Sequence, residues 1–128
     1  MSTLVAERIL IVAGILLLAV SALIGFIQAR EQSGSAQHTL WRVAHAGGTA
    51  GGVQLIALGA VIDRLRSALP PGATSAIILG LTIGTWAFFV GPLLRALGAE
   101  WHAKRVNIVG ALFAGPAYLS LPLLLLTE

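Results

Sequence analysis

Four long stretches without charged residues dominate this sequence and limit the folds that it can adopt. They cover residues 9–29, 43–62, 73–94 and 106–127. Each holds about 20 residues, which is the length that an α-helix needs to cross roughly 30 Å of hydrocarbon at about 1.5 Å per residue. The alternating pattern of about ten residues that marks a membrane β-strand does not fit them. The four stretches therefore predict four membrane-spanning helices.

The composition agrees with a chain that exposes most of its surface to lipid. Hydrophobic residues make up 57% of the 128 residues and charged residues 10%, against about 25% charged in an average soluble domain. The eight basic residues are spread along the chain without forming a patch, which excludes nucleic acid as a partner. The absence of cysteine excludes disulfides, thiolate metal sites and a cysteine nucleophile.

We predict an all-α fold, a four-transmembrane-helix bundle in a single integral membrane domain that covers residues 1–128. The lipid bilayer is its first expected partner, and the bacterial inner membrane is its expected location. The predicted helices cover roughly residues 5–29, 40–62, 73–95 and 104–127. Small residues recur at four-residue spacing in these helices, as is typical of helices that pack closely in a membrane.

An even number of spans puts both termini on one side and the first and third loops on the other. The loop side carries five basic residues and the side of the termini three, so the positive-inside rule favours the loop side as cytoplasmic. Trp41 and Trp101 lie at this boundary, where tryptophan commonly anchors a helix at the membrane surface.

The second stretch contains the one ionisable residue inside a predicted span, His45. Ionisable residues at membrane depth usually face an interior, a cavity or a ligand. The residues that share its helical face are Gly48, Thr49, Gly52 and Gly59. This face offers an imidazole followed by nearly bare backbone, along which haem could lie with a histidine nitrogen on its iron. We therefore predict His45 as a metal ligand, and Gly48, Thr49 and Gly52 as further cofactor-binding residues.

Two other interpretations of these residues stay open. Glycines four residues apart also form surfaces for close helix contact, and a histidine near an interface is often hydrogen-bonded to a carbonyl group. Alternatively, His38 and His102 belong to predicted loops on the same membrane side as His45, with Glu100 close by in sequence. Three histidines and a carboxylate are suitable donors for a metal ion.

The segment around His45 resembles the second helix of the hydroxylaminobenzene mutases and the styrene oxide isomerases. Residues 44–52, followed by a Leu-Ile-Ala-Leu-Gly run, are similar to the mutase pattern, and the spacing of Trp41 and His45 is similar to that of the isomerases. The Pro-Ala-Tyr-Leu run at 116–119 also resembles the isomerases. The isomerases are small four-helix membrane proteins that form trimers.

This resemblance implies a homotrimer that holds haem b between subunits, with His45 as the axial ligand. It also implies that the haem iron acts as a Lewis acid in the internal rearrangement of a small hydrophobic substrate, such as an epoxide that becomes an aldehyde. The family asparagine falls on Gly51, the mutase glutamate on Gly48, and the isomerase tyrosine on Phe89, or on Phe88 in a shifted register. Neither glycine nor phenylalanine can donate a side-chain hydrogen bond to a developing alkoxide, so the catalytic residues stay unassigned.

Three functions remain open on these grounds. The first is a haem-b-binding isomerase or mutase, assisted by the hydroxyls of Thr49, Thr85 or Tyr118. The second is a non-catalytic haem protein with a redox or sensor role, in which His38 or His102 is the second iron ligand. The third is a small transporter of the multidrug type, although proton-coupled export needs a titratable group in the membrane and the first predicted span has no acidic residue.

Overall fold

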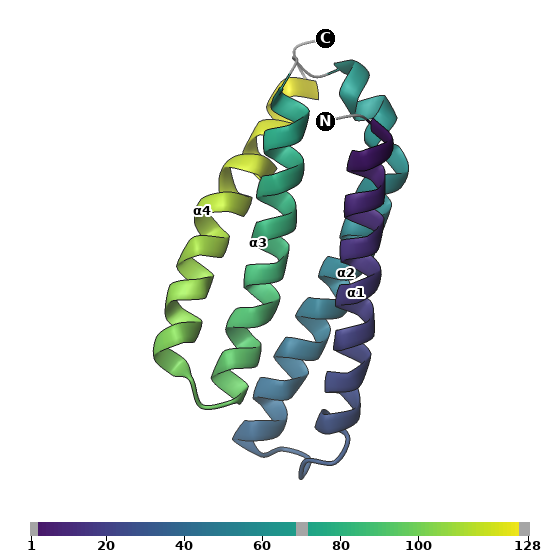
Figure 1. Ribbon diagram of the computed structural model, residues 1–128. Helices are drawn as coiled ribbons and strands as arrows, with labels where there is room; N and C mark the ends of the chain where they lie inside the picture. The colour runs from purple at the N-terminus through teal and green to yellow at the C-terminus, as the bar shows by residue number, and fades with distance from the viewer. Residues whose placement is uncertain (1–2, 69–71, 126–128) are drawn as a thin grey trace.

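The chain is a bundle of four α-helices in a computed structural model that describes residues 3–68 and 72–125 (Figure 1). The helices are α1 (Thr3–Gln28), α2 (Ala36–Ala68), α3 (Ala73–Ala96) and α4 (Glu100–Leu125). They alternate in direction, so that α1 begins and α4 ends at the same end of the bundle. The described ranges contain no strand. The predicted all-α four-helix fold is confirmed.

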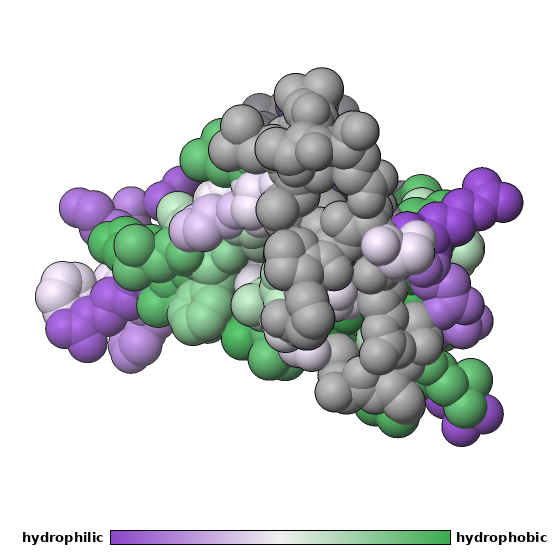
Figure 2. Space-filling view, turned by 90° about the horizontal axis from the view of Figure 1, so that it is seen from above, coloured by the Kyte–Doolittle hydropathy of each residue, from purple (hydrophilic) through white to green (hydrophobic). Residues whose placement is uncertain are grey.

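The described helices have the length and composition of membrane spans. Three of them are long and apolar enough to cross a bilayer: Leu4–Gln28, Ala36–Arg64 and Ala73–Ala96. The fourth predicted span, 106–127, extends outside the described residues. Seen along the helix axes, hydrophobic side chains cover much of the described surface between hydrophilic side chains that project at its edges (Figure 2). The chain is a membrane protein.

The helix α2 begins earlier and ends later than predicted. Its first turn is capped by Ser35, whose hydroxyl accepts a hydrogen bond of 3.0 Å from the backbone N–H of His38. At its other end, Asp63 and Arg64 continue the helix beyond the apolar stretch. Charged residues end a membrane span because they are costly in hydrocarbon, but they are compatible with a helix in water. The charged residues that bound the apolar stretch therefore do not mark the ends of α2.

The helices pack as two close pairs, α1 with α2 and α3 with α4, which meet mainly through α2 and α3. Glycines allow this approach. A Cβ on Gly14 would lie 2.7 Å from the carbonyl oxygen of Gly52, and a Cβ on Gly52 would lie 2.9 Å from that of Gly14. In the other pair, Gly84 faces Ala114 so closely that no side chain fits between them. Close backbone contact of this kind provides the dispersion attraction that joins helices in lipid.

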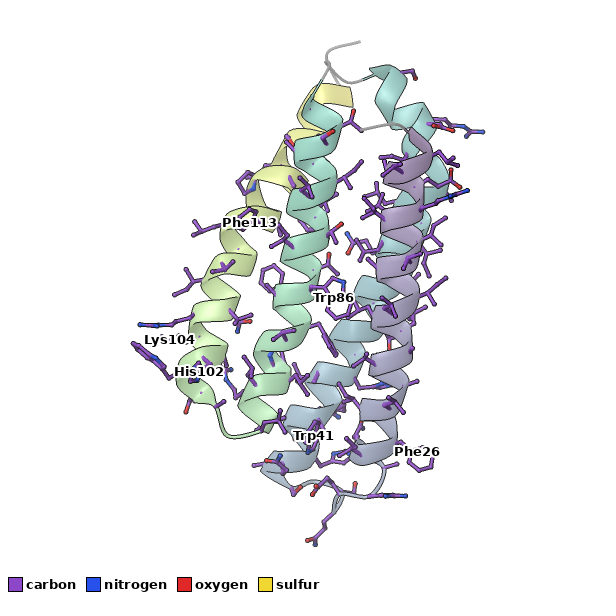
Figure 3. The ribbon with its side chains drawn as sticks, in the orientation of Figure 1. Phe26, Trp41, Trp86, His102, Lys104 and Phe113 are labelled. Carbon is purple, nitrogen blue, oxygen red and sulfur yellow. The ribbon has the colours of Figure 1, made fainter. Side chains whose placement is uncertain are left out.

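The two boundary tryptophans have different environments. Trp41 is only 7% exposed and belongs to the hydrophobic core (Figure 3). Trp101 is exposed, and the guanidinium of Arg105 lies 4.1 Å from its ring centre. The prediction of Trp41 as an interfacial anchor is therefore wrong. Since α2 begins at Ala36, Trp41 lies more than one turn inside the helix, on the face that meets the rest of the bundle.

Candidate functional site

His45 of α2 packs directly against α1. A Cβ on Gly25 would lie 2.9 Å from Cε1 and 3.0 Å from Nδ1 of the imidazole. The ring therefore fits only because the residue that faces it has no side chain. Gly25 and Ser21 are one turn apart on α1, so they form one continuous wall beside the histidine.

Three hydrogen-bond contacts join Ser21 and His45, one of them between the Ser21 Oγ and Nδ1 at 3.2 Å. The other two run in opposite directions between the helices. The imidazole Nδ1 donates to the carbonyl oxygen of Ser21 over 2.7 Å, and the Ser21 hydroxyl donates to the carbonyl oxygen of His45 over 2.6 Å. Ser21 is buried, with 1% of its surface exposed. A serine inside a helix commonly bonds the preceding turn of its own helix, whereas Ser21 bonds across to α2. The pair holds α1 to α2 and fixes the ring at the same point.

These contacts determine the tautomer of His45. A carbonyl oxygen can only accept a hydrogen bond, so Nδ1 carries the hydrogen and the lone pair of the neutral ring is on Nε2. No described residue pairs with Nε2, and this atom is not enclosed by the protein. Metal-binding histidines commonly donate their second ring N–H to a carbonyl in the same way. The geometry leaves Nε2 able to bind a metal.

Thr49 extends the hydrogen-bond network by one turn of α2. Its Oγ1 lies 2.8 Å from Oγ of Ser21 and 2.9 Å from the carbonyl oxygen of His45. The side chain is also exposed at the surface. Thr49 and His45 therefore lie together, as their shared helical face predicts. They are joined by the hydrogen bond to the His45 carbonyl and through the hydroxyl of Ser21.

The glycine face that follows His45 is covered by other helices. A Cβ on Gly48 would lie 2.7 Å from Cδ2 of Phe89, and a Cβ on Gly52 would lie 2.7 Å from Cγ of Leu18. Both glycines are buried. Since α1 lies on this face, its interpretation as a helix-contact surface is confirmed. The predicted contact of Gly48 and Gly52 with a cofactor has no support in this packing.

The alternative metal site is not formed. Within residues 3–68 and 72–125, no three histidine or acidic side chains come together as metal ligands. His38 lies beside Gln28, with 3.5 Å between the two Nε2 atoms. His102 is exposed on α4 (Figure 3), and α4 packs mainly on α3. His38 and His45 belong to the pair of α1 and α2, whereas His102 belongs to the pair of α3 and α4.

Comparison with known proteins supports the resemblance seen in the sequence. The family model described as styrene oxide isomerase matches residues 6–127. The chain belongs to the styrene oxide isomerase family. This membership is predicted by the residues around His45 and is confirmed over nearly the whole chain. A search of curated proteins and a search of solved structures each found no match.

The positions at which this member departs from the styrene oxide isomerase pattern are filled by apolar packing. A Cβ on Gly51 would lie 2.5 Å from Cγ2 of Thr85, so the threonine methyl group occupies the space that a larger residue at 51 would need. Phe89 is 1% exposed, and its ring contacts that of Trp86 edge-to-face at 6.0 Å. Gly51 and Phe89, which the resemblance aligns with the family asparagine and tyrosine, are thus both covered by neighbouring side chains.

The three hydroxyls that were candidates for assisting catalysis lie in different places. Thr49 is in the network of His45. Thr85 is buried beside Gly51, and its Oγ1 has no partner among the described residues. Tyr118 is exposed on α4, the helix that packs mainly on α3. Of the three, only Thr49 has a hydrogen bond to the backbone of His45.

Sequence reasoning did not identify Ser21 or Gly25 as functional residues. Both share a face of α1 with Gly14, and that face indicated only close helix packing. A more specific signal was available, because Ser21 is the one hydroxyl residue in the stretch 9–29, whose only other polar side chain is that of Gln28. A serine hydroxyl one helical turn from a glycine can form a hydrogen bond with a neighbouring helix, and the glycine leaves space for an aromatic ring beside it.

Proposed function

We propose that this chain binds haem b through His45 and catalyses the internal rearrangement of a small hydrophobic substrate in the bacterial inner membrane. The observation that carries the proposal is the free Nε2 of His45, whose other ring nitrogen is held by the Ser21 carbonyl at 2.7 Å. Membership of the styrene oxide isomerase family supports it. The residues fit the group, because the accessible edge of the imidazole presents the one nitrogen that can bind iron.

Ferric haem, when bound, supplies a Lewis acid for the oxygen of an epoxide such as styrene oxide, which can then open and rearrange to an aldehyde. The chain contributes the position of the axial ligand. Ser21 fixes the tautomer of His45, and Gly25 leaves the space in which the ring lies. Assembly as a homotrimer is part of this proposal.

Substitution of His45 by alanine is expected to remove haem from the purified protein. The variant lacks the nitrogen that binds iron, whereas His102→Ala changes an exposed side chain on α4 and serves as the matched control. Absorption spectra of both variants and the parent chain in detergent test this, after expression with haem supplied. We expect a Soret band from the parent and the control but none from His45→Ala. A colourless parent protein, or equal bands from all three, would contradict the proposal.

Substitution of Ser21 by alanine is expected to weaken haem binding without abolishing it. The backbone carbonyl that accepts from Nδ1 remains, but the hydroxyl that ties α1 to the His45 carbonyl is lost. Hydrogen bonds between membrane helices contribute about 0.6–1.7 kcal/mol, so haem affinity should fall about 3- to 18-fold.

The matched control is Ser120→Ala, because Ser120 bonds the carbonyl of Ala117 within its own helix. Titration of apoprotein with haem, followed at the Soret band, gives the affinities. Equal affinities for the two variants would show that the bond to His45 has no role in holding the ligand.

A second candidate function is haem binding without catalysis, in a redox or sensor role. The apolar packing of Gly51, Thr85 and Phe89 favours it, because the polar groups of the family pattern are absent there. The two functions are distinguished by incubating the protein with styrene oxide and measuring aldehyde by gas chromatography, with His45→Ala as the blank. Aldehyde above the blank supports the isomerase. No aldehyde, together with a carbon monoxide shift in the reduced spectrum, supports the non-catalytic role.

A further inference from the structure

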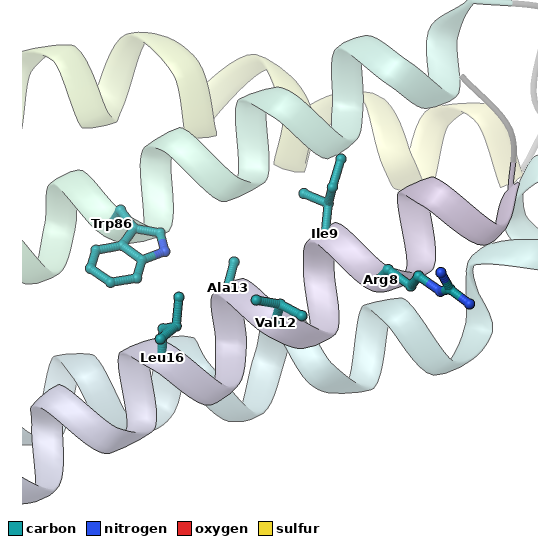
Figure 4. A pocket seen from close by; sticks show the side chains of 6 residues that line it. All are labelled: Arg8, Ile9, Val12, Ala13, Leu16 and Trp86. Atoms are coloured by element: carbon teal, nitrogen blue, oxygen red, sulfur yellow. The ribbon is translucent and has the colours of Figure 1, made fainter.

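A groove of about 510 Å³ lies between α1 and α3 (Figure 4). Its lining is Arg8, Ile9, Val12, Ala13, Leu16 and Trp86. None of these residues takes part in the hydrogen-bond network of His45. The volume is within the range of about 300–1,000 Å³ that is usual for sites that hold small molecules.

Trp86 places a hydrogen-bond donor in this groove. It lies near the middle of α3, roughly 20 Å along the helix from Ala73 at about 1.5 Å per residue. Figure 4 shows its indole nitrogen turned toward the side of the groove where Ala13 and Ile9 lie. No described residue accepts a hydrogen bond from Nε1, and the atom is not enclosed by the protein. At this depth water is scarce, so an unpaired N–H is unfavourable.

The other two tryptophans do not combine an unpaired indole N–H with a position on an open groove. The indole nitrogen of Trp41 is also unpaired among the described residues, but it is buried in the core, where a ligand cannot reach it. Trp101 lies in the first turn of α4 with Arg105 over its ring. Trp86 therefore differs from both, because its free donor faces a space that is accessible from the bilayer.

We propose that this groove binds a small uncharged apolar molecule that carries a hydrogen-bond acceptor oxygen, and that Trp86 Nε1 donates to that oxygen. The walls are aliphatic, and Val12 and Leu16 are more than half exposed, which leaves the groove open to the side. A molecule dissolved in the hydrocarbon layer can therefore reach it directly. Arg8 is the one charged residue of the lining and belongs to the first turns of α1, well away from the depth of Trp86.

The test compares two probes that have nearly the same shape, acetophenone and ethylbenzene, of which only the first has an acceptor oxygen. The full chain is placed in lipid nanodiscs, and bound probe is measured as the excess over empty nanodiscs. We expect saturable binding of acetophenone, and binding of ethylbenzene that is about 3- to 18-fold weaker, the range for membrane-buried hydrogen bonds. Trp86→Phe should remove the difference between the probes, whereas the control Trp101→Phe should preserve it.

Nuclear magnetic resonance of indole nitrogens locates the site. Acetophenone should move the signal of Trp86, assigned by its loss in Trp86→Phe, and should leave the signals of Trp41 and Trp101 in place. Leu16→Phe, which fills the groove without changing Trp86, should exclude both probes. Retention of acetophenone binding in His45→Ala would show that the groove acts independently of haem.

Three results would overturn the proposal. Equal binding of both probes to the parent chain would indicate that a lipid chain occupies the groove or that the donor is not used. A Trp86 signal that responds to neither probe would indicate that another molecule, such as a second copy of the chain, covers the groove. Unchanged acetophenone preference in Trp86→Phe would assign the binding to another place.

Discussion

Replacement of Gly25 by leucine is expected to abolish haem binding although His45 itself is unchanged. A Cβ at this position would lie 2.9 Å from Cε1 and 3.0 Å from Nδ1 of the imidazole, and the remaining leucine atoms need still more space. The ring would have to leave the Ser21 carbonyl, or α1 would have to move away from α2. In either case α1 and α2 would no longer fix the orientation of the imidazole, and with it the direction in which Nε2 points. We expect less than a tenth of the Soret absorbance of the parent chain.

The matched control for this substitution is Gly47→Leu. Gly47 is on α2, two residues from His45, and a Cβ there would meet nothing within 4 Å. Both substitutions raise helix propensity by up to about 1 kcal/mol, so neither should weaken its own helix. Haem content per protein, measured for both variants at equal yield, tests the prediction. Equal haem content would mean that the contact between Gly25 and His45 does not position the ligand.

Replacement of Gly84 by leucine is expected to separate α3 from α4. A Cβ on Gly84 would lie 2.9 Å from both Cα and the backbone nitrogen of Ala114, besides its contact with the Ala114 Cβ. Backbone atoms cannot rotate away, so the helices must move apart. Overpacking in a core costs about 1–3 kcal/mol when side chains can adjust, and we expect a loss at or above the top of this range.

Gly115→Leu is the control for this second substitution, because a Cβ on Gly115 would meet nothing within 4 Å. Unfolding of both variants in mixed detergent, followed by circular dichroism, gives the free energy of unfolding. The two variants should differ by about 3 kcal/mol or more. Similar stabilities would show that the α3–α4 contact tolerates a larger separation than the packing indicates. Haem binding at His45 should survive in Gly115→Leu.

The helices and the candidate ligand could be predicted from residues considered one segment at a time. A helix that crosses a membrane needs about 20 apolar residues. Charged residues bound such stretches in this chain, except that Pro70, Pro71 and Gly72 precede the third. His45 was identified because an ionisable group within a span is uncommon. Its surroundings in the sequence also carried the family resemblance, which the match over residues 6–127 confirmed.

Whether a neighbouring helix or lipid covers each face of a helix could not be predicted in the same way. Periodicity shows which residues share a face, but lipid and a neighbouring helix are equally apolar, so hydropathy does not distinguish the surfaces that they cover. The glycine face of α2 therefore stayed open between a surface for a cofactor and a surface for helix contact, and the structure places α1 on it. Trp41 was likewise placed at the interface although it is buried.

The four helices and the position of His45 within an apolar stretch were thus determined by the sequence by itself, because both follow from local hydrophobicity. Tertiary structure decided the neighbours and the hydrogen bonding of His45. It placed Ser21 and Gly25 of α1 against the imidazole, which sets the hydrogen on Nδ1 and leaves Nε2 without a partner among the described residues. Such contacts depend on how α1 and α2 approach one another, and that approach is set by the close packing of glycines on two separate helices.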